Sequence, residues 1–243
     1  MSDVMAHFSC GVASAVATKL AIGKFPDVRI FYCNTHSEHP DNARFLADCE
    51  RWFERPVRTV ESKAYRNTWD VFEKTRFLSS PQGARCTSEL KRIPAQEFWN
   101  IGTIEVFGYT ADEQKRVDRF KAQNEERIIE CPLIDAGLTK ADCFNIIKDA
   151  GIEIPAMYKL GFKNNNCIAC VKARDNINYW KRIRKYFPDE FKRMAAMERE
   201  LSFPLNRTGS KKNRKTIYLD QIPDGEPKGK DKSVSCGIVC GAK

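Results

Sequence analysis

The feature that most constrains the fold of this chain is an alternation of apolar, strand-like runs with helical patterns along its first 155 residues. Residues 28–33 (VRIFYC) form a continuous apolar run of the buried-strand type. After Pro40, Phe45, Cys49 and Trp52 recur at i, i+4 and i+7, the spacing of one helix face. Strands that alternate with helices in this way predict a Rossmann-like α/β fold, a parallel sheet with helices on both faces.

The same reasoning assigns the remaining elements and divides the chain. Expected strands cover residues 4–8, 28–33, 55–60, 103–109 and 127–131. Expected helices cover residues 14–22, 68–77 and 89–99, and another begins at a capping-box-like Thr139 and Asp142 and ends at Gly151. Two more helices are expected on either side of Pro188. We therefore expect an α/β domain (1–155), a helical region with a Cys-x-x-Cys (156–206), and a basic arm with a cysteine-containing tail (207–243).

Charge and the N-terminal sequence bound the cellular setting and the partners. The chain has 243 residues, no apolar run near the roughly 20 residues of a membrane span, and no basic segment before its first apolar stretch. We expect a cytoplasmic protein without a membrane partner. The net charge of +9 favours an anionic partner, a nucleotide or a nucleic acid. Cytosolic thiols stay reduced, so clustered members of the ten cysteines are expected to bind metal or do chemistry.

The turn after the first strand is the first candidate for a ligand site. It consists of small residues, Ser9-Cys10-Gly11-Val12-Ala13-Ser14. In open α/β sheets, ligands bind beyond the carboxyl ends of the strands, and a helix N-terminus there attracts phosphate. The same pattern also fits a tight strand-to-helix turn that holds no ligand.

Several motifs resemble the phosphoadenosine phosphosulfate (PAPS) reductase family, part of the PP-loop or adenine nucleotide alpha hydrolase group. The first match is FSCGVASAV, followed by a strand that ends in Cys33-Asn34-Thr35 and a helix start at His39-Pro40. ATP pyrophosphatases of the group have Ser-Gly-Gly-x-Asp-Ser in the loop. In this chain Cys10 replaces the second residue of that motif and Ala13 replaces the aspartate. PAPS reductases also lack that aspartate. The resemblance implies a HUP-type fold for the α/β domain.

Three later segments extend the resemblance to most of the chain. They are Arg85-Cys86-Thr87 with Lys91 and Pro94, Gly108 to Glu113 with Arg116 and Arg119, and Pro132 to Asp135. Thr110 stands where the family usually has an arginine, so we expect Arg116 or Arg119 to contact the anion. The resemblance implies that an adenine nucleotide, PAPS or ATP, contacts the residues Ser9, Cys10, Gly11, Ser14, Thr35, Lys91, Gly108, Tyr109, Arg116 and Arg119.

The Cys-x-x-Cys is the candidate metal motif, because two thiolates at this spacing can reach one metal centre. It consists of Cys167 and Cys170. In iron-sulfur members of the resembled family such a pair joins cysteines of the earlier element, which implies a 4Fe-4S cluster with Cys86. The fourth ligand is expected from the tail, with Cys240 as the candidate, from a group other than cysteine, or not at all. Zinc on the two Cys pairs 167/170 and 236/240 is the alternative, and free thiols packed in the interior are a third explanation.

The tail also suggests a nucleophile. Ser235-Cys236-Gly237-Ile238 resembles the Glu-Cys-Gly-Leu-His ending of PAPS reductases, whose cysteine attacks the sulfur of the sulfonucleotide. This implies a reductive enzyme with Cys236 as the catalytic residue, restored by a thioredoxin-like reductant. The rival interpretations are ATP-dependent thiolation of a nucleic-acid base and a non-enzymatic, nucleic-acid-binding zinc protein on the same fold.

Simpler structural explanations suffice for several other residues. Cys33, Cys49 and Cys143 lie among apolar neighbours and are expected to be buried, and His7 is expected to be a strand residue. His36 and His39 follow the second strand, where ligand contact is plausible. Aromatics alternate with basic residues over 179–186, which suits nucleic acid, but we favour an amphipathic helix. The basic stretch 207–232 is expected to be a solvated loop or arm.

Overall fold

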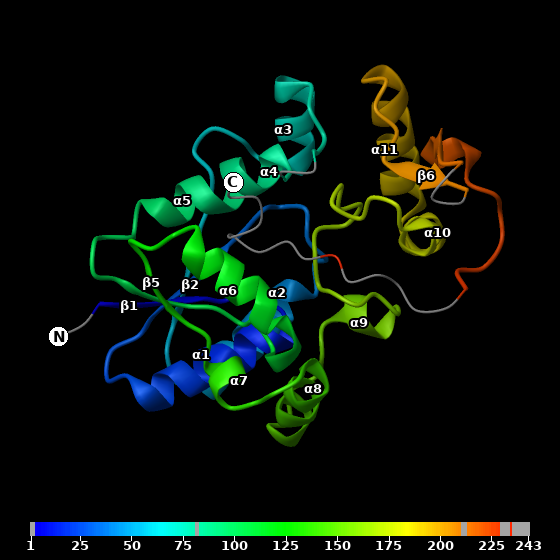
Figure 1. Cartoon of the computed structure of the whole chain (residues 1–243). Coiled ribbons are helices and arrows are strands. Elements are labelled where there is room, and N and C mark those ends of the chain that lie inside the picture. The colour runs from blue at the N-terminus through cyan, green and yellow to red at the C-terminus, as the bar shows by residue number, and fades with distance from the viewer. Residues whose placement is uncertain (1–2, 81–82, 210–212, 229–233, 235–243) are drawn as a thin grey trace.

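A five-stranded parallel sheet forms the centre of the computed structural model, which describes residues 3–80, 83–209, 213–228 and 234 (Figure 1). The strand order is β3-β2-β1-β4-β5, and each neighbouring pair is parallel. The strand bounds are β1 Val4–His7, β2 Arg29–Cys33, β3 Val57–Val60, β4 Ile104–Val106 and β5 Ile128–Glu130. The predicted Rossmann-like α/β fold is confirmed, and each strand lies within a segment expected from the sequence.

Helices cover both faces of this sheet, as Figure 1 shows. One face packs against α1 Val12–Lys24, α2 Asn42–Phe53, α7 Pro132–Asp135 and α8 Lys140–Asp149. The other packs against α5 Ile93–Gln96 and α6 Gln114–Ala122. α1 buries Ala15, Ala17 and Ala21, small side chains that let it lie close to the strands. The helix expected at residues 89–99 begins earlier, as α4 Arg85–Thr87 and the π-helical turn η1 Ser88–Arg92 lead into α5.

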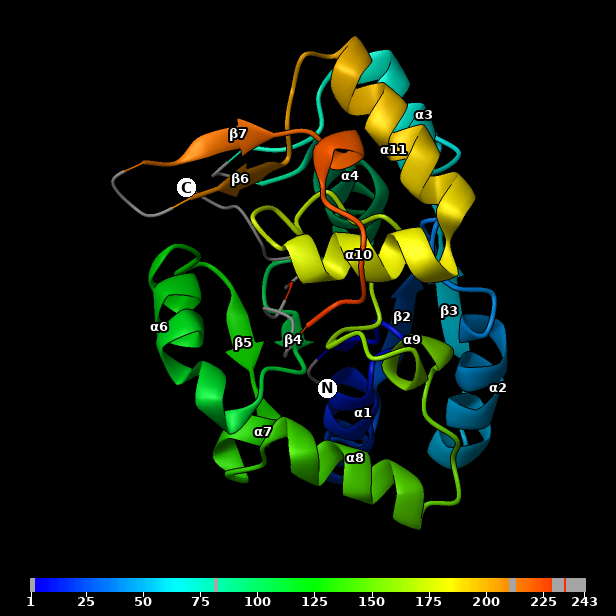
Figure 2. The ribbon, with the colours of Figure 1, turned by 90° about the vertical axis from the view of Figure 1, so that its right-hand side faces the viewer.

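A second hydrophobic core lies outside the sheet. It is built by α3 Thr68–Thr75, α4, α9 Ala156–Lys159, α10 Ile177–Tyr186 and α11 Pro188–Glu200. We call it the second core, and its large buried side chains are Trp69, Phe72, Leu78, Leu90, Met157, Phe162, Tyr179, Trp180, Ile183, Phe191, Met194, Leu205 and Leu219. Figure 2 shows α3 beside α11, although more than a hundred residues separate Glu73 from its ion-pair partner Arg193.

The α10 helix settles one of the alternatives left by the sequence. Trp180 and Ile183 are fully buried, and Trp180 Nε1 donates to Ala173 O at 3.0 Å. The amphipathic explanation is therefore confirmed. Tyr179 and Trp180 are buried and have no face left for stacking on nucleic-acid bases, whereas the Tyr186 ring is 40% exposed.

The stretch after α11 is ordered where the structure describes it. β6 Asn206–Thr208 and β7 Lys215–Ile217 form an antiparallel hairpin, and the 3-10 turn η3 Leu219–Gln221 follows. Leu219 and Ile222 are buried in the second core. Most described side chains of residues 207–228 are exposed, as expected for a solvated segment, but the segment is not simply a loop, because it forms the hairpin and because Leu219 and Ile222 anchor it despite its basic composition.

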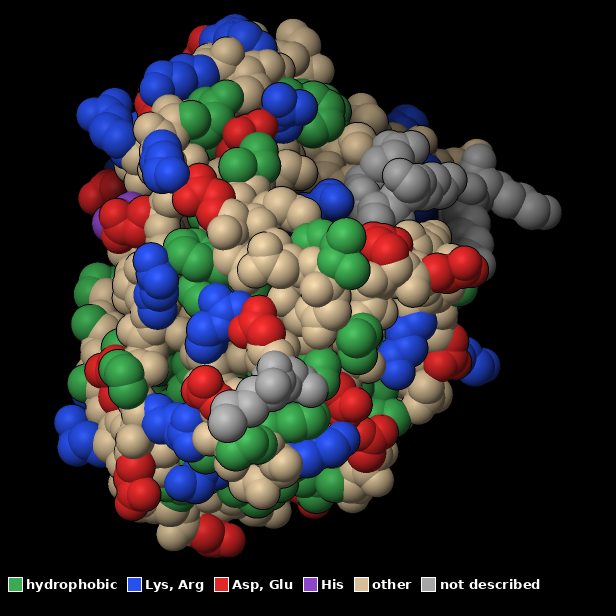
Figure 3. All heavy atoms as spheres, turned by 90° about the vertical axis from the view of Figure 1, so that its left-hand side faces the viewer, with side chains coloured by type: hydrophobic (Ala, Val, Ile, Leu, Met, Phe, Trp, Pro, Cys, Tyr) green, Lys and Arg blue, Asp and Glu red, His purple; other side chains and the backbone are tan. Residues whose placement is uncertain are grey.

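One face of the molecule shows how charged side chains are distributed on the surface. The face turned toward the N-terminus mixes Lys and Arg with Asp and Glu (Figure 3). Within the described ranges, no helix has both the length and the apolar composition needed to cross a membrane.

Candidate active site

A cavity of about 330 Å³ opens at the carboxyl ends of β1 and β4, the two strands between which the chain order of the sheet reverses. This is where ligands bind in open α/β sheets. Its walls come from the loop after β1, the loop after β4, and a segment just before the Cys-x-x-Cys. The lining residues are His7, Ser9, Gly11, Ala13, Ser14, Cys33, Lys91, Phe107, Gly108, Tyr109, Thr110, Asp112, Glu113, Arg116, Lys140, Tyr158, Asn164, Asn165 and Asn166.

The loop after β1 is organised around the hydroxyl of Ser14. Ser14 Oγ accepts from the backbone N–H groups of Ser9 at 3.0 Å and Gly11 at 3.3 Å, and it donates to Gly11 O at 2.9 Å. Cys10 adopts a left-handed backbone (φ 53°) with its side chain fully buried. A non-glycine residue held in this region stores strain, which is common in ligand-binding loops. The loop is thus folded before any ligand arrives.

The loop after β4 packs directly against the loop after β1. A Cβ on Gly108 would lie 2.7 Å from both Ser14 N and Ser14 Cα, far inside van der Waals contact with backbone. Only glycine permits that approach. Gly108 therefore brings the two loops together at the first turn of α1, whose N-terminal dipole favours an anion.

Three cationic side chains line the cavity against two acidic ones, Asp112 and Glu113. Arg116 bonds Glu113 Oε1 at 2.5 Å and lies over the Tyr109 ring, 4.7 Å from its centroid. Lys91 pairs with Glu38 at 3.2 Å. Burial lowers the pKa of Lys140, so its charge is held in a partly desolvated position. Cations in such surroundings attract phosphate more strongly than they would in bulk water.

Seven of the ten nucleotide-contact residues predicted from the resemblance line this cavity: Ser9, Gly11, Ser14, Lys91, Gly108, Tyr109 and Arg116. The other three lie elsewhere. The Cys10 side chain packs among apolar residues. Thr35 is buried beside Cys167, with Oγ1 and Sγ 3.1 Å apart. Arg119 is exposed, and its Nε donates to Lys115 O on its own helix. Of the two arginines proposed to replace the missing one at Thr110, the structure brings Arg116 to the cavity.

Three of the four predicted metal ligands lie among the described residues, and all three are buried. Cys86 and Cys170 are buried in the second core, and Cys167 lies against Thr35. Among the described residues, no group of three or more His, Cys, Asp or Glu side chains is arranged to hold a metal ion. Cys236 and Cys240 lie outside the described residues. The thiols expected to be buried, Cys33, Cys49 and Cys143, are so, and Cys131 is buried too.

A buried acid-base cluster adjoins the cavity through His7, and it was not predicted. His7 Nε2 bonds Glu105 Oε2 at 2.8 Å, and Arg127 reaches Glu105 Oε1 at 2.7 Å. The His7 ring stacks on Phe107 with centroids 4.5 Å apart. Burial alone would raise the pKa of Glu105, but the His7 hydrogen bond and the nearby Arg127 hold it below its usual value. His7 is a strand residue, as expected, yet it also lines the site.

The wall before the Cys-x-x-Cys was also missed. The Tyr158 hydroxyl is hydrogen-bonded to the backbone of Val12 and of Asn165. Burial raises the pKa of Tyr158 to about 12. Asn165 Nδ2 donates to Cys10 O and to Asn42 Oδ1, each at 2.7 Å. The run of three asparagines was the available signal, but a polar run before a cysteine pair is typical of any turn.

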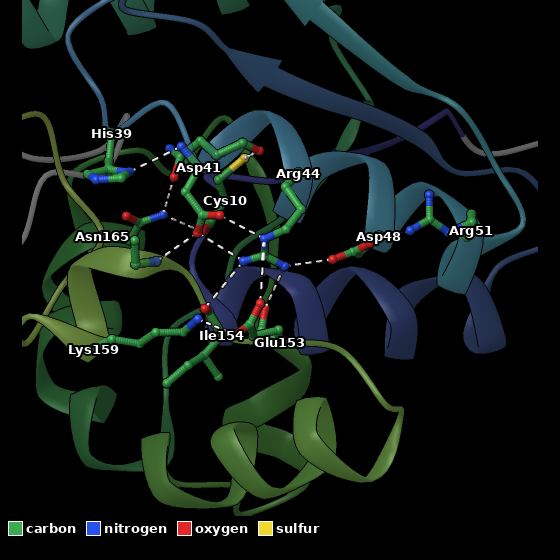
Figure 4. Close-up of polar contacts among 12 residues, drawn as sticks. Cys10, His39, Asp41, Arg44, Asp48, Arg51, Glu153, Ile154, Lys159 and Asn165 are labelled. Carbon is green, nitrogen blue, oxygen red and sulfur yellow. Dashed lines mark hydrogen bonds and ion pairs between the residues drawn. The ribbon is translucent and has the colours of Figure 1, made fainter.

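Figure 4 shows how this wall is attached to the sheet and the helices that cover it, a region that we call the sheet half. Arg44 of α2 forms a two-point pair with Asp41 at 2.7 and 2.9 Å, and it donates to the carbonyls of Glu153 at 3.0 Å and Ile154 at 3.3 Å. Asp41 in turn accepts from Ala156 N at 2.8 Å. Charge-assisted bonds to two backbone carbonyls fix the start of the segment that carries Tyr158 and Asn165.

A family model and solved structures relate this chain to known proteins. A family model described as the phosphoadenosine phosphosulfate reductase domain matches residues 3–173. Comparison with curated protein sequences gives no match. Nineteen chains of solved structures match, among them a phosphoadenylyl-sulfate (PAPS) reductase from Candida auris in a phosphate complex, at 12% identity and TM-score 0.49, covering 69% of this chain and 82% of that one. The family match spans the loop after β1, the loop after β4 and the Cys-x-x-Cys, and the chain belongs to the phosphoadenosine phosphosulfate reductase family.

Proposed function

We propose that this enzyme binds PAPS in the cavity at the ends of β1 and β4 and reduces its sulfonate group to sulfite. Family membership supports adenine-nucleotide binding and sulfur reduction in general. The observation that carries the specific proposal is the contact of Gly108 with the first turn of α1, which forms an anion-binding corner beside Lys91, Arg116 and Lys140. A nucleotide with a second phosphate and a sulfonate matches three cations better than a singly charged ligand does.

Within this proposal the described residues bind and orient the nucleotide. The N-terminus of α1, Lys140 and Arg116 all line the cavity, and Arg116 stacks on Tyr109. Arg116 is already held by Glu113, so its guanidinium enters the complex with little loss of conformational freedom. Tyr158, with its raised pKa, stays neutral and bonds the loop that the phosphates approach.

The sulfur chemistry is assigned to Cys236 on the basis of the family resemblance. The Cys236 thiolate attacks the sulfonate sulfur, the bond from that sulfur to the phosphate oxygen breaks, and adenosine bisphosphate leaves with the electron pair. This forms an S-sulfonated cysteine. One thiolate of a thioredoxin-type dithiol donor then attacks the Cys236 sulfur, which breaks its bond to the sulfonate, releases sulfite and leaves a mixed disulfide. The second thiolate of the donor attacks the donor sulfur of that disulfide and expels the Cys236 thiolate. The donor ends as a disulfide and Cys236 regains its thiol, so the two electrons come from the donor.

The expected iron-sulfur cluster remains a separate proposal. Cys86, Cys167 and Cys170 do not by themselves form a group suited to a metal, so no step above is assigned to one. A cluster or a zinc ion would require further ligands, for which Cys240 is the candidate from the sequence. Iron, zinc and acid-labile sulfide measured on anaerobically purified protein, beside a Cys240→Ser variant, test that proposal.

A matched pair of arginines tests the nucleotide site. Both lie on α6, but Arg116 lines the cavity and Arg119 is exposed. We expect Arg116→Ala to weaken binding of adenosine bisphosphate by about 10- to 100-fold, since a charge-assisted contact is lost. Arg119→Ala should stay within about twofold. Isothermal calorimetry measures both. Equal losses, or tighter binding of ATP than of adenosine bisphosphate by the wild type, would contradict the proposal.

A further inference from the structure

The wall formed by Asn164, Asn165 and Asn166 has two sides, and they contact different parts of the chain. Asn165 points to the loop after β1, where it donates to Cys10 O. Its two neighbours bond instead to Val234, a residue of the C-terminal tail. Three adjacent residues of this segment therefore reach both partners.

Val234 is held at both of its backbone groups. Its N–H donates to Asn164 Oδ1 at 3.2 Å, and its carbonyl accepts from Asn166 Nδ2 at 2.6 Å. The side chain is buried, with 7% exposed, within the second core. Two hydrogen bonds and an apolar contact at one residue make a specific attachment, because side-chain amides can satisfy both the donor and the acceptor of a peptide unit.

A second asparagine holds the chain upstream in the same manner. Lys228 N donates to Asn178 Oδ1 at 3.1 Å, and Asn178 Nδ2 donates to Lys228 O. Asn178 lies in the first turn of α10, a short distance along the chain from the Cys-x-x-Cys. Lys228 and Val234 are therefore both attached to one segment, residues 164–178, and the attachment of Val234 adjoins the cavity.

We propose that Asn164 and Asn166 are positioning residues that dock the backbone of Val234 at the rim of the nucleotide cavity. The asparagines line the cavity themselves, so the tail is brought to the place where the nucleotide binds. Two residues of chain span at most about 7 Å, which limits the distance between Val234 and Cys236. The functional consequence rests on the proposed role of Cys236, whereas the docking itself does not.

Coupling between the nucleotide and the tail follows from the same geometry. Asn165 bonds the loop that is proposed to bind phosphate, and its two neighbours hold the tail. A ligand that fixes the loop also fixes this segment, and by linkage a docked tail favours the bound loop. Adenosine bisphosphate should therefore slow hydrogen exchange at Val234.

Two aspartate substitutions of equal charge and shape test the docking in the full-length protein. Asn166→Asp replaces the donor to Val234 O with an oxygen, which loses the bond and adds repulsion. Asn164→Asp keeps an oxygen that can accept from Val234 N–H. We expect exchange of the tail peptide containing Val234, followed by mass spectrometry, to quicken at least tenfold in Asn166→Asp. In Asn164→Asp it should stay within about threefold of wild type.

The outcomes separate this proposal from the proposed function. Unchanged exchange in Asn166→Asp, or equal acceleration in both variants, overturns the docking. If docking holds and Cys236 is the nucleophile, Asn166→Asp lowers kcat for sulfite release at least tenfold and changes KM less. A wild-type protein that forms no sulfite from PAPS refutes the proposed function, and the exchange result then still decides the docking. Asn145→Ala, exposed on α8, serves as the control for folding and exchange.

Discussion

The sheet half and the second core differ in how their contacts are distributed along the chain. In the sheet half, α1 follows β1 directly and packs on the strand that precedes it. In the second core, α3 packs with α10 and α11, and its Glu73 pairs with Arg193. The first kind of contact is implied by the order of the elements, whereas the second joins segments that no local pattern connects.

The comparison bears on the organisation of the whole molecule. The second core includes residues on both sides of the boundary expected at residue 155, from Trp69 of α3 to Leu219 of η3. The cavity lies where the two regions meet, since its walls come from strand ends and from Asn164 to Asn166. A site built in this way depends on both regions, so damage to either core should be visible in nucleotide binding.

The largest expected effect on stability comes from removing a large buried side chain from the second core. Trp180→Ala removes a fully buried indole and leaves Ala173 O without its donor, so we expect a loss of about 4 kcal/mol in the free energy of unfolding. Urea denaturation followed by circular dichroism measures it. Tyr186→Ala on the same helix, where the ring is 40% exposed, should cost less than about 1 kcal/mol. Similar losses for both would mean that α10 is not packed as described.

The next effect belongs to the sheet half. Glu105→Gln leaves His7 and Arg127 without a carboxylate in a buried position, and we expect a cost of about 3 kcal/mol at pH 7. Because the folded pKa of Glu105 is depressed, this stabilisation is present above the unfolded pKa and is lost as pH falls through the folded pKa. Unfolding at pH 7 and at about pH 2 to 3, well below the ordinary pKa of Glu, gives the difference.

Glu126→Gln is the matched control for that variant. Glu126 also lies near Arg127, at 3.6 Å, but its side chain is 63% exposed. We expect a change within about 0.5 kcal/mol at either pH. If Glu105→Gln behaves like this control, the cluster of His7, Glu105 and Arg127 contributes no more to the free energy of unfolding than an exposed ion pair does.

The comparison also explains which features the sequence could predict. The capping box at Thr139 and Asp142 depends on residues three positions apart, and the structure contains it. The alternation of strands and helices, the loop after β1 and the burial of Trp180 follow from equally local patterns. The bond between Asn165 and Cys10 joins residues 155 positions apart, and that between His7 and Glu105 spans 98. A single sequence contains no information on such pairings, so these parts of the site could not be foreseen.

Thr35 and Arg119 show the same limit of sequence-based prediction, because they were predicted to contact the nucleotide and do not line the cavity. Both were assigned to the nucleotide by their positions in family-like segments. The chain places Thr35 against Cys167, far along the sequence, and turns Arg119 to solvent one helical turn from Arg116. Motif position indicates the right loop, but the direction of each side chain is set by packing.

The smallest expected effect concerns the attachment of the hairpin segment, which sequence patterns did not reveal. Glu198 is fully buried on α11, and its two carboxyl oxygens accept from Leu205 N and from Leu219 N at 2.5 and 2.7 Å. Gln has one acceptor oxygen, so Glu198→Gln leaves one of these N–H groups unsatisfied. We expect a cost of about 1 to 2 kcal/mol in urea unfolding at pH 5.

The pH dependence of that cost distinguishes a buried acid from an ordinary hydrogen-bond acceptor. Burial raises the pKa of Glu198 to about 7, although the two backbone bonds act in the opposite direction. Stability from the protonated form is complete below the unfolded pKa of Glu, about 4.3, and is lost as pH rises through the folded pKa near 7. Wild type should therefore lose stability between pH 5 and pH 8, while Glu198→Gln does not. The difference in free energy of unfolding between the two proteins should narrow over this range. Glu200→Gln, two residues on and exposed, should show a small and constant difference at both pH values. If the difference in free energy of unfolding instead widens toward pH 8, the two backbone hydrogen bonds, rather than burial, determine the ionisation state of Glu198.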